Sequence, residues 1–115
     1  MRWVHVLLAL AMVAFAAVQL NDPDAPLWIA YYAVPAFWAL MAAFRQRLLY
    51  RMRWLGALWA CVAGWVALVV YYWPTAPGFW RVAVWMNDEP AREGMGLMIA
   101  LGVLMVALFS AYRRR

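Results

Sequence analysis

An uncharged apolar stretch near the middle of the chain decides the fold: residues 54–73 read WLGALWACVAGWVALVVYYW. An α-helix needs about 20 such residues to cross the hydrocarbon core of a lipid bilayer, which is about 30 Å thick. A stretch of this length without Asp, Glu, Lys or Arg is typical of a transmembrane helix, whereas buried helices of soluble proteins have shorter apolar runs. The stretch therefore predicts a helix that spans a membrane.

Three further segments share this length and lack of charge, at residues 3–20, 25–44 and 94–112. None of them alternates polar and apolar residues, as a strand of a transmembrane barrel would. The sequence therefore predicts an all-α membrane protein in which residues 1–115 form a single transmembrane domain, a four-transmembrane-helix up-down bundle. Ala14 and Ala16 resemble a signal-peptide cleavage site, but we expect the first segment to stay as an uncleaved anchor.

The composition excludes several classes of protein. Of the 115 residues, 70% are hydrophobic and 13% are charged, against about 25% charged residues in soluble domains. A soluble fold of this size buries only about 60–70% of its unfolded surface, so a soluble secreted enzyme is excluded. The single cysteine, Cys61, and the single histidine, His5, exclude an intrachain disulfide, a thiolate cluster and a site with several histidines.

The arginines indicate an orientation. Eight of the ten fall on one side of the predicted bundle: Arg2, Arg45, Arg47, Arg51, Arg53, Arg113, Arg114 and Arg115. Only Arg81 and Arg92 fall on the other side. Because positively charged loops stay in the cytoplasm, we expect a multi-pass protein of a bacterial inner membrane with both termini cytoplasmic. Arginines that flank apolar segments are a membrane pattern, so no nucleic-acid partner is expected.

The connection between the third and fourth segments carries a helical pattern of its own. Phe79, Val82, Ala83 and Met86 recur at helical spacing, with Arg81 among them. An amphipathic helix of this kind lies flat at the surface of a bilayer. The pattern predicts a short interfacial helix that covers the outer end of the bundle.

Small residues recur every four positions in two of the predicted helices. Gly56, Ala60 and Gly64 form one ridge, and Gly96 with Ala100 forms another. Such ridges let helices approach closely in lipid, where packing drives association. Each ridge could serve the bundle itself, or it could bind a second copy of the chain or a partner membrane protein. The sequence leaves these alternatives open.

All acidic residues lie on the side opposite to most arginines, next to the starts of the second and fourth segments. As caps and first-turn residues they would stabilise the positive ends of those helices, and Arg92 could also neutralise Asp22 or Asp24. The same cluster could instead bind a cation, or a polar or anionic ligand. The candidate ligand-binding residues are Gln19, Asn21, Asp22, Asp24, Trp28, Glu89, Arg92 and Glu93.

Oxygen ligands without His or Cys favour Ca²⁺ or Mg²⁺ over zinc or copper. If a metal binds, we expect Asn21, Asp22, Asp24 and Glu93 to be its ligands. The spacing is not that of an EF-hand, because the glycine and the bidentate glutamate of that loop are missing. No other cofactor is expected, and no residue is assigned a catalytic role.

Two groups of residues resemble a known family. Residues 18–28 read VQLNDPDAPLW, residues 32–36 read YAVPA, and residues 89–99 read EPAREGMGLMI. Together they are similar to the two motifs of the transmembrane protein 220 family, although Met95 stands between the Arg-Glu-Gly run and the Gly-Leu pair of the second motif. The resemblance implies a small multi-span membrane protein without an established activity. It also implies that Asn21, Asp22 and Asp24 pair with Arg92 and Glu93.

Three functions are compatible with these patterns. The short length, the ridges and the lack of a nucleophile–base pair favour a non-enzymatic accessory or structural membrane module. A cation- or polar-ligand-binding protein would use the Asn-Asp-Pro-Asp and Arg-Glu motifs. An enzyme that modifies a lipid or quinone at the interface would use a carboxylate as general base. A pump or channel fits least, because the segments lack ionisable residues within the membrane.

Overall fold

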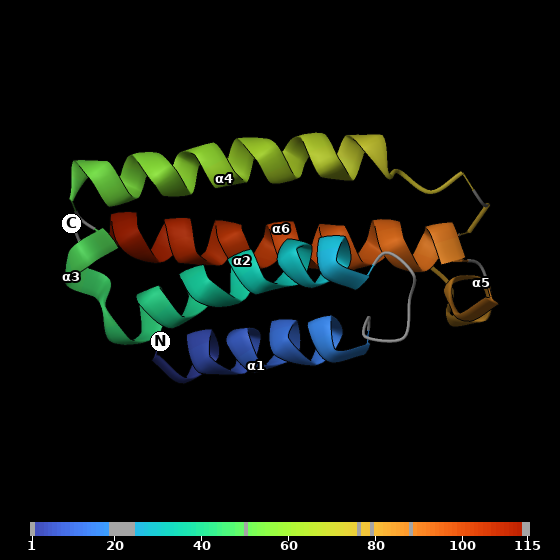
Figure 1. Ribbon diagram of the computed structural model, residues 1–115, viewed down its shortest axis with the longest axis horizontal. Coiled ribbons are helices and arrows are strands. Elements are labelled where there is room, and N and C mark those ends of the chain that lie inside the picture. Colours follow the sequence, from blue (N-terminus) through green and yellow to red (C-terminus); the bar gives the residue numbers. More distant parts are fainter. Residues whose placement is uncertain are drawn as a thin grey trace.

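The computed structural model describes residues 2–18, 25–49, 51–75, 77–78, 80–87 and 89–113, and within these ranges the regular structure is entirely helical. The helices are α1 (Arg2–Val18), α2 (Ala25–Phe44), α3 (Gln46–Leu49), α4 (Met52–Tyr71), α5 (Val82–Asn87) and α6 (Glu89–Arg113) (Figure 1). The prediction of an all-α protein is confirmed for these residues.

The helices coincide with the apolar segments in their middle parts and differ at some ends. α2 has the predicted bounds, whereas α4 begins at Met52 and ends at Tyr71, two residues ahead of each predicted boundary. α4 ends there because Pro74 disfavours helical backbone in the residue before it. α6 begins at Glu89, five residues before the predicted start, since hydropathy detects only the apolar part of a helix whose backbone hydrogen bonds continue into the polar part.

The number of helices long enough to cross a membrane differs from the prediction. Among the described residues, three helices are long and apolar enough: α2, α4 and the Pro90–Tyr112 part of α6. α1 has 17 residues, which at about 1.5 Å per residue gives about 26 Å, less than the hydrocarbon thickness. The prediction of four spans is thus confirmed for three of them. The crossing by the first segment stays a prediction, because the end of the predicted segment 3–20 lies outside the described residues.

α6 is the central helix of the molecule. α1 packs on α2 along its length, and both α2 and α4 pack on α6 (Figure 1). α4 is the most peripheral of the three membrane-length helices, because only 22% of its span is buried, compared with 50% for α2 and 56% for α6. A short helix, α5, follows α4 at the end of the bundle where α6 begins. It overlaps the segment predicted to be helical, while its position in the interface stays a prediction.

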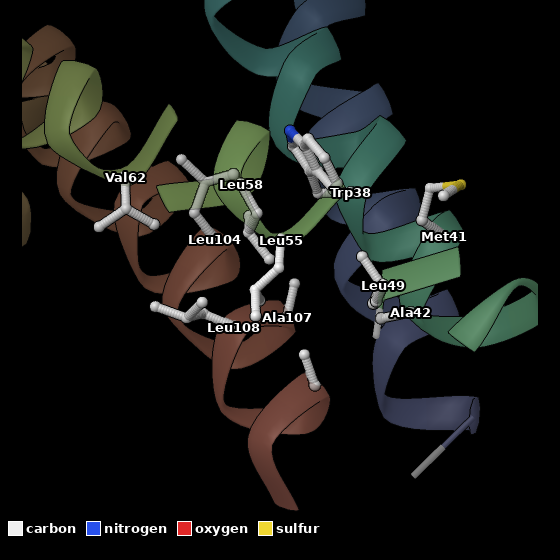
Figure 2. Packing of buried hydrophobic residues seen from close by; sticks show 11 residues of the cluster. Trp38, Met41, Ala42, Leu49, Leu55, Leu58, Val62, Leu104, Ala107 and Leu108 are labelled. Carbon is white, nitrogen blue, oxygen red and sulfur yellow. The ribbon is translucent and has the colours of Figure 1, made fainter. Parts of the chain in front are cut away.

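Two clusters of buried side chains hold these helices together. In the first, Leu104 of α6 lies beside Leu55 and Leu58 of α4, with Trp38 of α2 facing them (Figure 2). In a bilayer the fit of such side chains stabilises the bundle, because lipid tails are as apolar as the side chains themselves. The second cluster joins α1, α2, α4 and α6 near the other end of the bundle. That second cluster positions the candidate site.

Candidate functional site

The structure places only part of the predicted ligand-binding set. Gln19, Asn21, Asp22 and Asp24 lie outside the described residues, and so does the side chain of Glu89. Trp28 lies in the first turns of α2, and Arg92 and Glu93 lie in the first turns of α6. Because α2 and α6 begin at the same end of the bundle (Figure 1), Trp28, Arg92 and Glu93 share that end.

An aromatic cluster forms this end of the bundle. The ring of Trp28 contacts the rings of Tyr31 and Tyr72 edge to face, with centroids 5.0 and 5.1 Å apart. Tyr32 contacts Phe15 of α1 in the same way, at 5.4 Å. Trp28 is 2% exposed and Tyr32 is 3% exposed, so both rings pack inside the bundle. Trp28 and Tyr32 are therefore core residues of the bundle. A role of Trp28 in ligand binding stays a prediction.

Polar atoms of the cluster link α2 to α4. Trp65 of α4 donates a hydrogen bond from Nε1 to the carbonyl oxygen of Tyr31, at 3.1 Å. The hydroxyls of Tyr31 and Tyr72 share a longer hydrogen bond, at 3.4 Å. Because α4 packs mainly on α6, these bonds supply a direct connection between α4 and α2 at this end.

Two glycines of the second motif allow the chain to close around the cluster. A Cβ atom on Gly94 would lie 2.6 Å from both the carbonyl oxygen of Tyr72 and the ring of Pro74. A Cβ atom on Gly96 would overlap the hydroxyl of Tyr32. Gly96 and Ala100 are buried, so the ridge that they form serves packing within the bundle. The sequence did not reveal the role of Gly94, because this residue falls outside the four-residue spacing of Gly96 and Ala100.

The phenol of Tyr72, which lies just beyond α4, stays neutral over the physiological range. The hydrogen bond with Tyr31, burial and the nearby negative charge of Glu93 together raise the pKa of Tyr72 to about 12. A neutral phenol donates and accepts hydrogen bonds but does not act as a base at neutral pH. This end therefore offers hydrogen-bonding groups and the half-buried carboxylate of Glu93.

The described part of the chain holds no group of three His, Cys, Asp or Glu side chains arranged to bind a metal. Three of the four predicted metal ligands, Asn21, Asp22 and Asp24, lie outside the described residues. The Ca²⁺ or Mg²⁺ site therefore stays a prediction.

Comparison with known sequences agrees with this architecture. Residues 11–109 match the profile of a family described as "Transmembrane family 220, helix". The chain belongs to that family. Transmembrane protein 220 of Xenopus laevis is 31% identical over 93 residues, which are 79% of this chain and 49% of the frog protein. This chain thus spans about half the length of that relative. No solved structure matches this chain.

Membership of transmembrane family 220 changes one expectation. The family and the three apolar helices together show an integral, multi-pass membrane protein. The predicted location in a bacterial inner membrane has no support, because the relative is a frog protein. Neither the family nor the helices support the predicted cytoplasmic position of the termini. The family match indicates no enzymatic activity or other specific role.

Proposed function

We propose that this member of transmembrane family 220 is a non-enzymatic accessory or structural module that binds another transmembrane helix through the outer face of α4. One observation carries the proposal: Cβ atoms added to Gly56 and Gly64 would have no atom of the chain within 4 Å. We call Gly56, Ala60 and Gly64 the α4 ridge. All three residues are exposed.

The α4 ridge lies away from the contact between α4 and α6. α4 buries Leu55, Leu58, Val62 and Val69, which recur at the spacing of one helix face. The residues of the ridge alternate with these in sequence and are exposed, so packing within the bundle does not explain why they are small.

Glycine inside a helix costs about 1 kcal/mol relative to alanine. Gly94 and Gly96 offset this cost by allowing close contacts within the chain. Gly56 and Gly64 have no such contact within the described residues. A second transmembrane helix seated on the ridge would provide one, because small residues four apart let two helix backbones approach closely in lipid.

Native mass spectrometry of the protein in a mild detergent tests the proposal. We expect the wild-type protein to carry a second copy or another membrane protein, and G56L/G64L to lose it. G102L is the matched control, because Gly102 on α6 also has open space around a Cβ atom. A wild-type protein that is strictly monomeric and binds no other protein would contradict the proposal, as would equal losses in G56L/G64L and G102L.

The arrangement of the bundle in the membrane belongs to the same proposal. We propose that α1 also crosses the membrane, that both termini lie on one side, and that α5 lies in the interface. α1 runs antiparallel to α2, and α1 begins where α6 ends (Figure 1), which supports this topology. Single cysteines at the exposed positions Arg51 and Thr75, in a C61A background, should react with an impermeant maleimide from opposite sides of sealed vesicles. Labelling of both from one side would contradict the topology.

A second candidate is a cation- or polar-ligand-binding site at the aromatic end. Glu93 supports it, because this half-buried carboxylate lies near the Tyr72 phenol at the start of α6. Thermal unfolding with added Ca²⁺ or Mg²⁺ should show a rise in Tm that D22N abolishes. A Tm that no divalent ion changes would remove the cation site. No described feature favours the lipid- or quinone-modifying enzyme.

A further inference from the structure

An open cavity of about 410 Å³ lies at the end of the bundle opposite to the aromatic cluster. Its volume is within the range of about 300–1,000 Å³ that small-molecule sites occupy. The lining residues are Arg2, Ala43, Phe44, Arg45, Gln46, Arg47 and Leu48. Three of these are arginines and none is acidic, so the cavity is suited to an anion.

The corner between α2 and α3 fixes the backbone position of two of the arginines. Arg45 stands between the two helices, where its N–H donates to the carbonyl oxygen of Met41 at 2.8 Å. The carbonyl oxygen of Arg45 accepts a hydrogen bond from the N–H of Leu48 at 3.0 Å. Arg45 and Arg47 therefore extend from a hydrogen-bonded backbone corner and not from a flexible tail.

The third arginine comes from a different helix, α1. Arg2 begins α1, and its Cζ atom lies 5.9 Å from the centre of the Phe44 ring. At this distance a guanidinium is attracted to the face of an aromatic ring. The contact keeps the positive charge of Arg2, which α1 supplies, beside the cavity that Arg45 and Arg47 also line.

The net charge of the cavity comes from these side chains. The start of α1 carries a partial positive charge and the end of α2 carries a partial negative charge, each about half an elementary charge. These two partial charges offset each other where the helices meet. No acidic side chain in the described part of the chain lines the cavity, and Glu93 lies near the start of α6, at the opposite end of the bundle. Within the described residues, the three guanidiniums therefore give the lining of the cavity a net positive charge.

The chemistry of the lining identifies the class of ligand. Planar guanidiniums bind the oxygens of a phosphate with paired, charge-assisted hydrogen bonds, and the amide of Gln46 can add another. Beside them the cavity has an apolar part, formed by Ala43, Phe44 and Leu48. Phe44 is 59% exposed, at the end of a membrane-length helix, where the headgroups of lipids lie.

We propose that this cavity binds a phosphate group, and that the carrier of the phosphate is the headgroup of an anionic phospholipid. The arginines hold the phosphate oxygens, while the apolar part contacts the glycerol backbone and the first carbons of the acyl chains. This site is separate from the α4 ridge and from the aromatic end, so it does not depend on the function proposed above.

Native mass spectrometry in a mild detergent measures the binding, with phosphatidylglycerol, diacylglycerol and inorganic phosphate as three separate ligands. Diacylglycerol has the acyl chains without the phosphate, whereas inorganic phosphate lacks the acyl chains. We expect phosphatidylglycerol to bind and diacylglycerol not to bind. R45Q/R47Q should weaken phosphatidylglycerol binding about tenfold or more, because it removes two of the three phosphate ligands.

The matched control is R51Q/R53Q, which removes two charges from the nearby start of α4 but none from the lining of the cavity. It should change the affinity less than about twofold, since charges outside the cavity are screened by salt. Circular dichroism should show equal helix content in both variants. All four arginines are exposed, so neither variant leaves a buried gap.

Three results would overturn the proposal: equal weakening in both double variants, no weakening in either, or binding of diacylglycerol as tight as that of phosphatidylglycerol. The first would indicate a diffuse attraction to the whole basic end, and the third would indicate an apolar groove. If inorganic phosphate binds as tightly as phosphatidylglycerol, and R45Q/R47Q weakens it, the phosphate site is supported and its carrier is free phosphate instead of a lipid.

Discussion

Gly94 and Gly96 of α6 lie against other parts of the same chain, whereas Gly56 and Gly64 of α4 have open space around them. The two pairs have the same chemistry, and both lie in apolar helices. Gly94 and Gly96 lie near the start of α6, where Tyr72 and Pro74 on one side and Tyr32 on the other pack against it. α4 has one main neighbour, and its ridge is on the other side. The comparison teaches that the same small-residue pattern can build a bundle or remain available to a partner.

The largest effect is expected for G94A. A Cβ atom at this position would lie 2.6 Å from the Tyr72 carbonyl oxygen and from the Pro74 ring. Neither of these can move without moving the backbone, so we expect a loss of about 2–3 kcal/mol in the free energy of unfolding. Thermal unfolding in detergent measures the change. Wild-type stability in G94A would show that the connection after α4 does not pack on α6 as described.

G96A should have the next largest effect. Its Cβ atom would overlap the hydroxyl of Tyr32, which belongs to a buried side chain, so we expect a loss of about 1–2 kcal/mol. Y32F removes the overlapping oxygen and leaves the ring, whose nearest atom is 3.1 Å from the added Cβ. The double variant Y32F/G96A should therefore be more stable than G96A. A double variant in which the two losses simply add would exclude this contact as the cause.

G56A should change stability in the opposite direction. The added Cβ meets no atom of the chain, so we expect the isolated chain to gain about 0.5–1 kcal/mol from the higher helix propensity of alanine. Thermal unfolding at low protein concentration measures the gain. A destabilised G56A would mean that a neighbour already covers the ridge under those conditions, and the contrast between the two glycine pairs would then be weaker.

The smallest effect concerns the pH dependence of stability. The pKa of Tyr72 rises to about 12 in the folded chain, from about 10 in the unfolded chain. The folded state therefore holds this proton more tightly. Its stabilising effect is complete below pH 10 and is lost as the pH rises toward 12. Unfolding measured between pH 9 and pH 12 should show a shallower decline in Y72F than in the wild type. Identical declines would show that Tyr72 does not contribute.

Hydropathy predicted most of the fold, because lipid selects uninterrupted apolar segments. Hydropathy predicted both ends of α2, because a charged residue, Asp24 or Arg45, directly adjoins the apolar segment at each end. It placed the start of α6 too late, since Glu89, Arg92 and Glu93 are polar but still helical. It also gave the first segment a membrane-spanning length that α1 does not reach within the described residues.

The candidate site was predictable in kind more than in detail. The motif residues Trp28, Arg92 and Glu93 do share one end of the bundle. The sequence did not reveal that Trp28 contacts Tyr31 and Tyr72. Tyr72 is far from Trp28 in sequence, and only the packing of the helices brings the two rings together. The basic cavity was missed for the same reason. Arg2 and Arg45 are far apart in sequence, and only the antiparallel packing of α1 and α2 brings them to one cavity.

The sequence alone determined that the chain is helical and membrane-embedded, because apolar length and the need to satisfy backbone hydrogen bonds in lipid leave little choice. It also separated the acids from most arginines along the chain. The tertiary structure alone decided which glycines are covered, which aromatic rings are buried and which arginines meet. These contacts depend on the order in which the helices pack, with α6 between α2 and α4. Helices that are apolar on every side carry no sequence pattern that specifies this order.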